Sequence, residues 1–246
     1  MKTPALIIVS VLLLAFTQSH LLADDLPGMR PALLGRGPRS LVNLINLQSL
    51  LKRGQGNATV MFSCGVDTLG NAGGGEYYRG TPNSNMLGRE VVERCDQAQF
   101  EPAVFRHNRV TTWISGTVTF IVKDGKPHLR VFLNQEAKDL IQGHDFVVPQ
   151  FAFVLGNYKF RGINWPANAP GHQGMAAVTL DVDETGKVLN AKTVYEYPPG
   201  MGFGREVVGP IREALFIPGF RDGKPVRCQF TWVLGFEGPG RQMKTG

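Results

Sequence analysis

Residues 87–92 read LGREVV, and residues 203–208 read FGREVV. The two stretches are 116 positions apart, and at that offset residues 58–120 align with residues 174–236 without a gap. The chain therefore contains an internal duplication. For a chain of 246 residues, a duplication predicts two small domains, each long enough to bury a core of its own.

The repeated stretch predicts a helix in each copy. Apolar residues recur there at helical spacing and form one helix face: Leu87, Val91, Cys95 and Ala98 in the first copy, and Phe203, Val207, Ile211 and Ala214 in the second. The Arg and Glu of the motif lie off that face, which indicates a solvated or locally paired surface, with a functional role as the alternative. Pro210 lies inside the second helix and is expected to kink or shorten it.

Alternating apolar residues predict strands on both sides of each helix. The first strands are marked by Val60, Phe62, Cys64 and Val66, and by Ala176, Val178, Leu180 and Val182. A polar Asp-x-x-Gly turn follows each of them, at Asp67–Gly70 and Asp183–Gly186. Each copy thus has the order strand, turn, strand, helix, strand. This order predicts an α+β fold, in which a small antiparallel sheet carries a helix on one face.

The N-terminus has the layout of a secretory signal peptide. Lys2 precedes an apolar run over residues 5–16, and Ala23 stands before two aspartates. The run is shorter than the roughly 20 apolar residues that a spanning helix needs. We therefore expect cleavage after Ala23 and a periplasmic protein. Retention as an inner-membrane anchor that faces the periplasm is the alternative.

The remaining segments set the expected boundaries. A helix from Ser40 to about Arg53 opens the first copy. Residues 135–142 are expected to form a short helix, and residues 146–155 an apolar strand. The predicted divisions are a signal peptide (1–23), an extended lead-in (24–39), a first domain (40–122), a hairpin, helix and connector (123–160), a second domain (161–238) and a tail (239–246).

Charge and composition exclude several classes of function. The net charge is +6, but the lysines and arginines are scattered, which indicates a solvated surface and no nucleic acid partner. His107, His128, His144 and His172 lack metal-ligand spacing and are expected in surface loops. Gly73–Gly75 lacks the Lys of a phosphate loop and is expected at a flexible hairpin tip. No nucleophile has a nearby base, so we expect no enzyme, metal or cofactor.

The three cysteines are too few for a disulfide-built miniprotein. Cys64 takes the place of Leu180 on the core face of a strand, and Cys95 takes the place of Ile211 on the core face of the helix. We therefore expect these two to face each other and to form a disulfide worth about 3–4 kcal/mol by loop-closure entropy. Two buried thiols are the alternative. Cys228 is expected to be an inert buried thiol.

The second copy resembles a known family. The segments GMAAVTLDVDETGKV (174–188) and ALFIPGFRDGKPVRCQFTWVLGF (214–236), with the predicted helix between them, are similar to the C-terminal domain of TonB, the periplasmic energy transducer. The likeness covers about residues 163–236 and includes the Phe-x-Pro and Asp-Gly-Lys-Pro-Val patterns before the last strand. Through the duplication it extends, more weakly, to residues 42–120.

The resemblance implies a domain that binds proteins, in two tandem copies. In this family the last strand accepts an extended peptide from an outer-membrane receptor, by addition to a sheet edge. Carried over, that strand is residues 226–236, and the implied role is in TonB-dependent transmembrane transport. The residues that the resemblance assigns to the partner are Asn164, Trp165 and Pro166, before the first strand, and Arg227, Gln229 and Thr231, on the outward face of the last.

Two features separate the chain from an energy transducer. A transducer needs a stable inner-membrane anchor and a long proline-rich span, and we expect neither here. A soluble envelope scaffold or cell-wall-binding protein without energy transduction is therefore an open alternative. A secreted enzyme with a site between the two domains is a further alternative, and it would need a cleft rich in perturbed acids or histidines.

Overall fold

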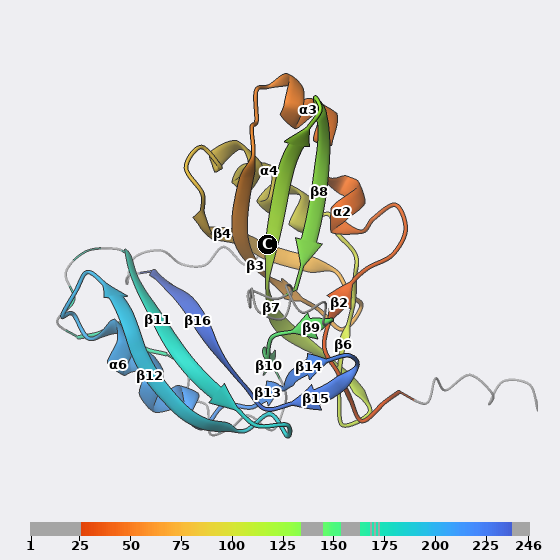
Figure 1. The fold of residues 1–246 in the computed structure, drawn as a ribbon. Coiled ribbons are helices and arrows are strands. Elements are labelled where there is room, and N and C mark those ends of the chain that lie inside the picture. Colours follow the sequence, from red (N-terminus) through yellow and green to blue (C-terminus); the bar gives the residue numbers. More distant parts are fainter. Residues whose placement is uncertain are drawn as a thin grey trace, which may run out of the picture.

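The computed structural model describes residues 26–133, 145–153, 163–167, 169, 171 and 173–237. The fold is α+β, with mostly antiparallel sheets and few helices. Figure 1 shows two twisted sheets that are joined near their base by short strands. The expected signal peptide, the helix at 135–142 and the tail at 239–246 lie outside the described residues.

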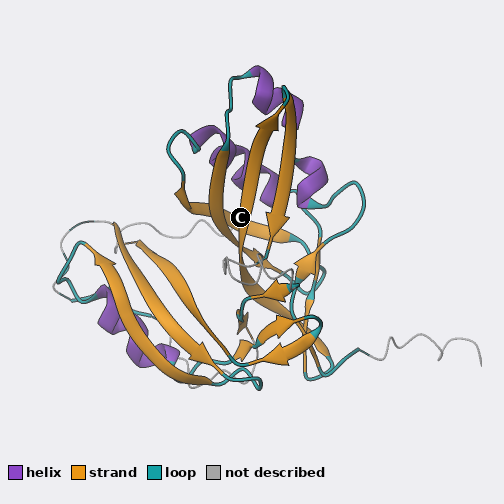
Figure 2. Cartoon of the chain, in the orientation of Figure 1, coloured by secondary structure: helices purple, strands orange, loops and turns teal. Residues whose placement is uncertain are grey.

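The first main sheet has the strand order β4, β3, β7, β8, and all its neighbours are antiparallel. Helix α4 (Asn85–Cys95) covers one face of it, as Figure 2 shows. The predicted apolar face of α4 is buried against the alternating side chains of β3, which are likewise buried. The strands are β3 (Ala58–Val66), β4 (Ala72–Gly80), β7 (Asn108–Lys123) and β8 (Lys126–Phe132).

The second main sheet has the strand order β12, β11, β16, again antiparallel throughout. Helix α6 (Phe203–Ile211) packs on one face and buries its predicted apolar side chains there. The strands are β11 (Gln173–Val182), β12 (Val188–Tyr197) and β16 (Cys228–Glu237). At the offset of 116 residues, β3 corresponds to β11, β4 to β12, α4 to α6 and β7 to β16. The predicted order of strand, turn, strand, helix, strand is confirmed in both copies.

Packing explains why the motif recurs. Its first and fifth positions are core residues of the helices, and its glycine allows the helix to touch the neighbouring strand. A Cβ at Gly88 would lie 2.8 Å from the ring of Tyr77 on β4. A Cβ at Gly204 would overlap Thr193, the equivalent residue on β12. The glycine that the two copies share thus allows a close helix–strand contact in each of them.

Each main sheet is preceded in sequence by an extended segment that pairs with the chain after its helix. The pairs in the first copy are β1 (Met29–Arg30) with β6 (Ala103–Phe105), and β2 (Leu33–Leu34) with β5 (Phe100–Glu101). The pairs in the second are β9 (Phe146–Val147) with β14 (Gly219–Arg221), and β10 (Gln150–Phe153) with β13 (Phe216–Ile217); β15 (Lys224–Val226) follows β14. The segment expected to be a lead-in is therefore part of the packed first half, and Ala32 within it is fully buried.

The short strands also join the two cores. Strand β10 pairs with β13 on one side and with β7 of the first copy on the other. Neighbouring side chains then alternate between the cores: Val147, Ala152, Ile217 and Phe220 enter the first, and Phe146, Val148, Phe151 and Phe216 enter the second. The connection between the copies is thus a shared layer of strands.

Two predicted helices differ from expectation. The helix expected over residues 40–53 is split into α2 (Leu41–Leu44) and α3 (Leu47–Lys52), because Ile45 adopts an extended conformation and Asn46 caps α3. Helix α6 has nine residues against eleven in α4, but Pro210 does not end it early. Both helices end at equivalent positions, and α6 instead begins later, after Gly202 in a left-handed conformation.

Candidate protein-binding edge

Strand β16 is one of the two edge strands of the second main sheet within the described ranges, and β12 is the other. Strand β16 pairs with β11 along its whole length, from Cys228 opposite Val182 to Glu237 opposite Gln173. Its other edge carries no strand among the residues that the structure describes. Such an edge presents a row of N–H and C=O groups that can pair with an extended segment of another chain.

The direction of each amide in β16 follows from the turn at the end of β11 and from the pairing of β11 with β16. The N–H of Asp183 donates to the carbonyl of Lys187 at 3.0 Å and so points toward β12. Amides alternate in direction along a strand, so Val182 points the other way, toward its partner Cys228. By the same alternation, the amides that face the open edge are those of Gln229, Thr231, Val233 and Gly235.

Two of the three residues expected on the outward face are available there. Gln229 and Thr231 are exposed on the side away from α6. Arg227 is exposed too, but it precedes β16, and its guanidinium donates to Asp181 at 3.0 Å through Nε and at 2.6 Å through Nη2. The hydrogen bond from Arg227 holds the pKa of Asp181 below its ordinary value. The guanidinium of Arg227 is thus paired with Asp181 of the same sheet.

The predicted aromatic-proline segment lies at the opposite end of β16. Trp165 packs edge to face on Phe203 with ring centroids 5.1 Å apart, and Phe203 packs on Phe236 of β16 at 4.9 Å. The indole Nε1 of Trp165 donates to the carbonyl of Ala169 at 3.2 Å. Pro166 is buried and Asn164 is exposed. The structure therefore brings Trp165 close to the Phe236 end of the strand and leaves Arg227 far from it.

The equivalent edge of the first main sheet is occupied. Residues 117–123 of β7 pair with β8, and residues 111–113 pair with β10. Helix α3 contacts β8, and the positions equivalent to α3 in the second copy are 163–168, which include Trp165. The same chain thus contains an example of an antiparallel strand on this edge, flanked by the segment that corresponds to the one around Trp165.

Glu196 closes the N-terminus of α6. Its carboxylate accepts the N–H of Gly204 at 2.8 Å and the N–H of Gly202 at 3.2 Å, and these bonds, chiefly the one from Gly204, lower the pKa of Glu196. A lowered folded-state pKa means that the stabilisation is present above the unfolded value near 4.5 and is lost as the pH falls through the folded value.

We expect Glu196→Gln to lower the free energy of unfolding by about 1 kcal/mol at pH 7, as for the loss of a charged helix cap. The deficit should shrink as the pH falls below 4.5 and through the lowered folded-state pKa of Glu196, because protonation removes the charge that the wild-type cap uses. Urea unfolding at pH 7 and at pH 3.5 measures both values. A deficit of equal size at both pH values would contradict the assignment.

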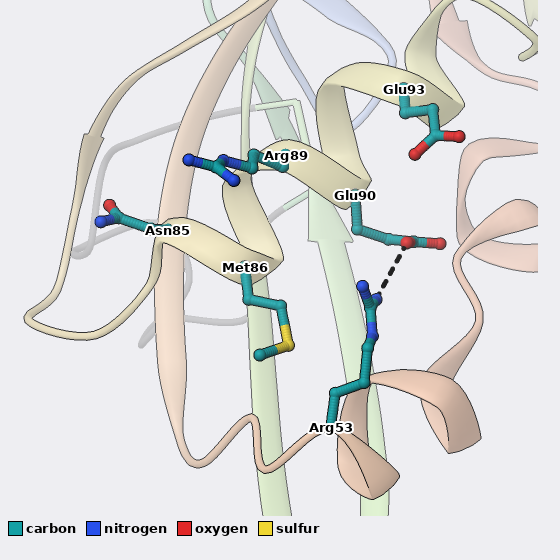
Figure 3. A pocket seen from close by; sticks show the side chains of 6 residues that line it. All are labelled: Arg53, Asn85, Met86, Arg89, Glu90 and Glu93. Atoms are coloured by element: carbon teal, nitrogen blue, oxygen red, sulfur yellow. Dashed lines mark hydrogen bonds and ion pairs between the residues drawn. The ribbon is translucent and has the colours of Figure 1, made fainter.

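A cavity of about 510 Å³ lies on the first copy, beside α4 and the end of α3 (Figure 3). Its carboxylate Glu90, the Glu of the repeated motif, is only 6% exposed. Glu90 accepts from Arg53 at 3.3 Å, from Arg94 at 3.0 Å and from the N–H of Asn46 at 3.3 Å. Glu90 of the motif is therefore locally paired, as expected, but it is buried and not on a solvated surface. The residues around the cavity are Arg53, Asn85, Met86, Arg89, Glu90 and Glu93.

Cys64 of β3 and Cys95, the last residue of α4, lie against each other between the sheet and the helix, as expected from their positions in the repeat. Both are fully buried free thiols in this structure, and a hydrogen bond between them raises the pKa of Cys64. Their disulfide stays a prediction. Intact mass after alkylation without reductant tests it, and labelling of both would contradict it. Cys228, expected to be buried, is half-buried.

Other candidates from the sequence lie elsewhere. His128 was expected in a loop, but it belongs to β8, while His107 lies in a turn where its Nδ1 is 2.7 Å from the carbonyl of Leu26. His144 and His172 fall outside the described residues. Gly73–Gly75 does not form a hairpin tip but lies within β4, where Gly74 sits against Trp113. Among the described residues, no three His, Cys, Asp or Glu side chains gather as a metal site.

Comparison of the chain with protein families, with curated proteins and with solved structures gives no match. In the ranges that the structure describes, every helix is too short or too polar to cross a bilayer.

Proposed function

We propose that this chain is a periplasmic protein-binding module of the TonB C-terminal type, built from two tandem domains, in which the open edge of β16 takes up an extended segment of an outer-membrane receptor. One observation carries the proposal: two equivalent edges differ in occupancy. β7 carries β8 along its edge, whereas β16 carries no strand in the described part of the chain. An open edge of this length is what strand addition requires.

The coverage of the two cores supports the same proposal. Val118 and Phe120 of β7 are 0% exposed next to β8. Their equivalents on β16 are less well covered, since Leu234 is half-buried and Phe236 is 8% exposed. A strand laid on β16 would pair the edge amides and bury these apolar side chains in one step, and both effects favour binding.

The proposal includes no catalytic step, cofactor or nucleic acid. The acids with lowered pKa values have structural roles. Asp181 pairs with Arg227, Glu196 caps α6, and Asp67 and Asp183 accept backbone amides of their own turns. Binding to a receptor would connect the module to TonB-dependent transmembrane transport. A soluble envelope scaffold without transduction is the alternative, and it predicts different captured proteins.

The test is capture from detergent-solubilised envelope by immobilised protein, with three forms of the full chain compared. Wild type should capture an outer-membrane β-barrel receptor. Val233→Pro removes an amide that faces the open edge and should lose the receptor, because proline at an outward-facing edge position blocks a partner strand without breaking the bond to β11. Val233→Ala keeps the amide and should retain most of the capture.

Circular dichroism must first show that Val233→Pro is folded. Receptor capture that is equal in Val233→Pro and Val233→Ala would contradict strand addition at β16. Capture of cell-wall material or of soluble envelope proteins, with no barrel receptor, would replace the transport role with the scaffold role.

A further inference from the structure

The outward face of the second main sheet is apolar at one end and polar at the other. Register places residues from the three strands in rows across this face. The apolar rows are Tyr197, Met175, Gly235 and Tyr195, Ala177, Val233, and the polar rows are Lys192, Thr179, Thr231 and Asn190, Asp181, Gln229. Tyr195 and Tyr197 on β12 are 51% and 56% exposed, and the rows that they begin cross β11 and end at Val233 and Gly235 on β16.

The apolar rows lie at the half of β16 that corresponds to the occupied part of β7. β8 pairs with β7 from Thr117 onward, and Thr117 corresponds to Val233. In the first copy the same rows are more polar: Thr119 beside Thr59, whose hydroxyls are 3.4 Å apart, and Thr117 beside Met61 and Arg79. The two edges are thus equivalent in geometry and different in chemistry.

Gly235 leaves a gap in the first apolar row. A Cβ built at this residue meets no atom within 4 Å, so the space beside Met175 and in line with Tyr197 is open. A side chain that projects from an added strand opposite Gly235 would enter this space. Cross-strand pairing of a glycine with an aromatic residue is a favourable arrangement in sheets, because the ring covers the exposed backbone.

Resting on the proposed function, we propose that the strand accepted by β16 runs antiparallel to it, in the register of β8, and carries a large apolar side chain, preferably aromatic, opposite Gly235. Its alternate side chains, which face inward, are apolar as well, since they cover Leu234 and Phe236 beside Phe203 and Trp165. In β8 the corresponding inward residues are Val131 and Leu129, opposite Val118 and Phe120. The partner therefore supplies a short extended segment that is apolar on both faces.

The probes are three capped peptides based on β8, KPHLRVF. In this register the Arg of the peptide lies opposite Gly235, because Arg130 lies opposite Thr119. KPHLFVF replaces that Arg with Phe and should bind about three- to fivefold more tightly, as expected for a favourable cross-strand pair. KPHSRSF replaces both inward apolar residues with Ser and should bind at least roughly tenfold more weakly, because it buries less apolar area.

Binding is followed by NMR titration of the full chain, through the amide signals of Val233 and Gly235. The matched control is Gly235→Thr, which restores the residue of the first copy and has room for its side chain. In this variant the preference for KPHLFVF over KPHLRVF should fall below about twofold, because the Thr side chain fills the gap that the ring would cover.

A nitroxide on the C-terminus of KPHLFVF reports orientation. In the antiparallel register, the C-terminus lies near Val233 and Thr231, so their amide signals should broaden most. Strongest broadening near Glu237 would mean a parallel strand and would overturn the inference. Equal binding of all three peptides would also overturn the inference. The same holds if none of the peptides binds the wild-type chain although Val233→Pro still abolishes receptor capture. That last result would leave the proposed function standing, whereas receptor capture unaffected by Val233→Pro would remove the proposed function itself.

Discussion

Gly186→Ala should lower the free energy of unfolding by roughly 3 kcal/mol, which is a large part of the stability of a protein of this size. Gly186 closes the Asp-x-x-Gly turn with φ at +88°, a conformation that costs alanine about 1 kcal/mol. A Cβ there would also overlap the carbonyl oxygen of Phe216. That backbone cannot simply move away, because the N–H of Phe216 donates to the carbonyl of Gly186 at 2.9 Å.

The matched control for this effect is Gly223→Ala. Gly223 also has a positive φ, +78°, but a Cβ built on it meets nothing within 4 Å. It should therefore lose only the conformational part, about 1 kcal/mol. Urea unfolding of the two variants measures the difference. Similar losses in both would mean that crowding against Phe216 contributes little, and that the turn is not fixed to the chain after α6.

Gln150→Leu should cost about 2–4 kcal/mol, because it leaves two buried backbone groups without partners. The side chain of Gln150 is 1% exposed; its Oε1 accepts the N–H of Ala32 at 2.7 Å, and its Nε2 donates to the carbonyl of Ala32 at 2.9 Å. Leucine has a similar volume, so the loss comes from hydrogen bonding and not from a cavity.

Amide hydrogen exchange distinguishes this mechanism from a general loss of stability. In Gln150→Leu, the amides of residues 29, 30 and 32–34 should exchange faster by a larger factor than those of β3, because the first extended segment loses its link to β10. The exposed substitution Gln97→Leu serves as control and should stay within about 0.5 kcal/mol of wild type. A loss below about 1 kcal/mol for Gln150→Leu would contradict the role assigned to this pair.

The duplication predicted the main sheets and their helices because its signals are local. Alternation along nine or ten residues of a strand, helical spacing in the motif and the Asp-x-x-Gly turn each lie within one short stretch. The faces of the last strand followed from the same alternation, and so Gln229 and Thr231 were correctly expected to be exposed.

The short strands could not be predicted in this way. β1 and β2 have two residues each, too few for any periodicity, and their partners lie about 70 residues away in the sequence. Their counterparts β9 and β10 are offset by 117 residues, not 116, because Met29 and Phe146 occupy equivalent pairings. An alignment without gaps therefore misses them. The burial of Glu90 was missed for a similar reason, since it depends on α3.

Val233 and Gly235 were also missed as candidate contacts, although a signal for them exists in the sequence. Position by position, the two copies differ there, with Thr117 and Thr119 in the first and Val233 and Gly235 in the second. The difference becomes informative only once the structure shows that the first pair is covered by β8 and the second lies at an open edge. Equivalent positions of β7 and β16 then carry side chains of different polarity, which indicates that the strand added to β16 differs from β8.

The open edge of β16 is proposed to form main-chain hydrogen bonds with a partner, and residue-resolved amide exchange measures this directly. In the free protein, the amides of Thr231, Val233 and Gly235 should exchange fast, while Trp232 and Leu234 are already protected by β11. In the complex with a captured receptor or a bound peptide, the amides of Val233 and Gly235 should become protected, because their equivalents Thr117 and Thr119 are the positions that β8 pairs, and those of Trp232 and Leu234 should change little. Unchanged exchange at Val233 and Gly235 in a saturated complex would contradict strand addition at the edge of β16.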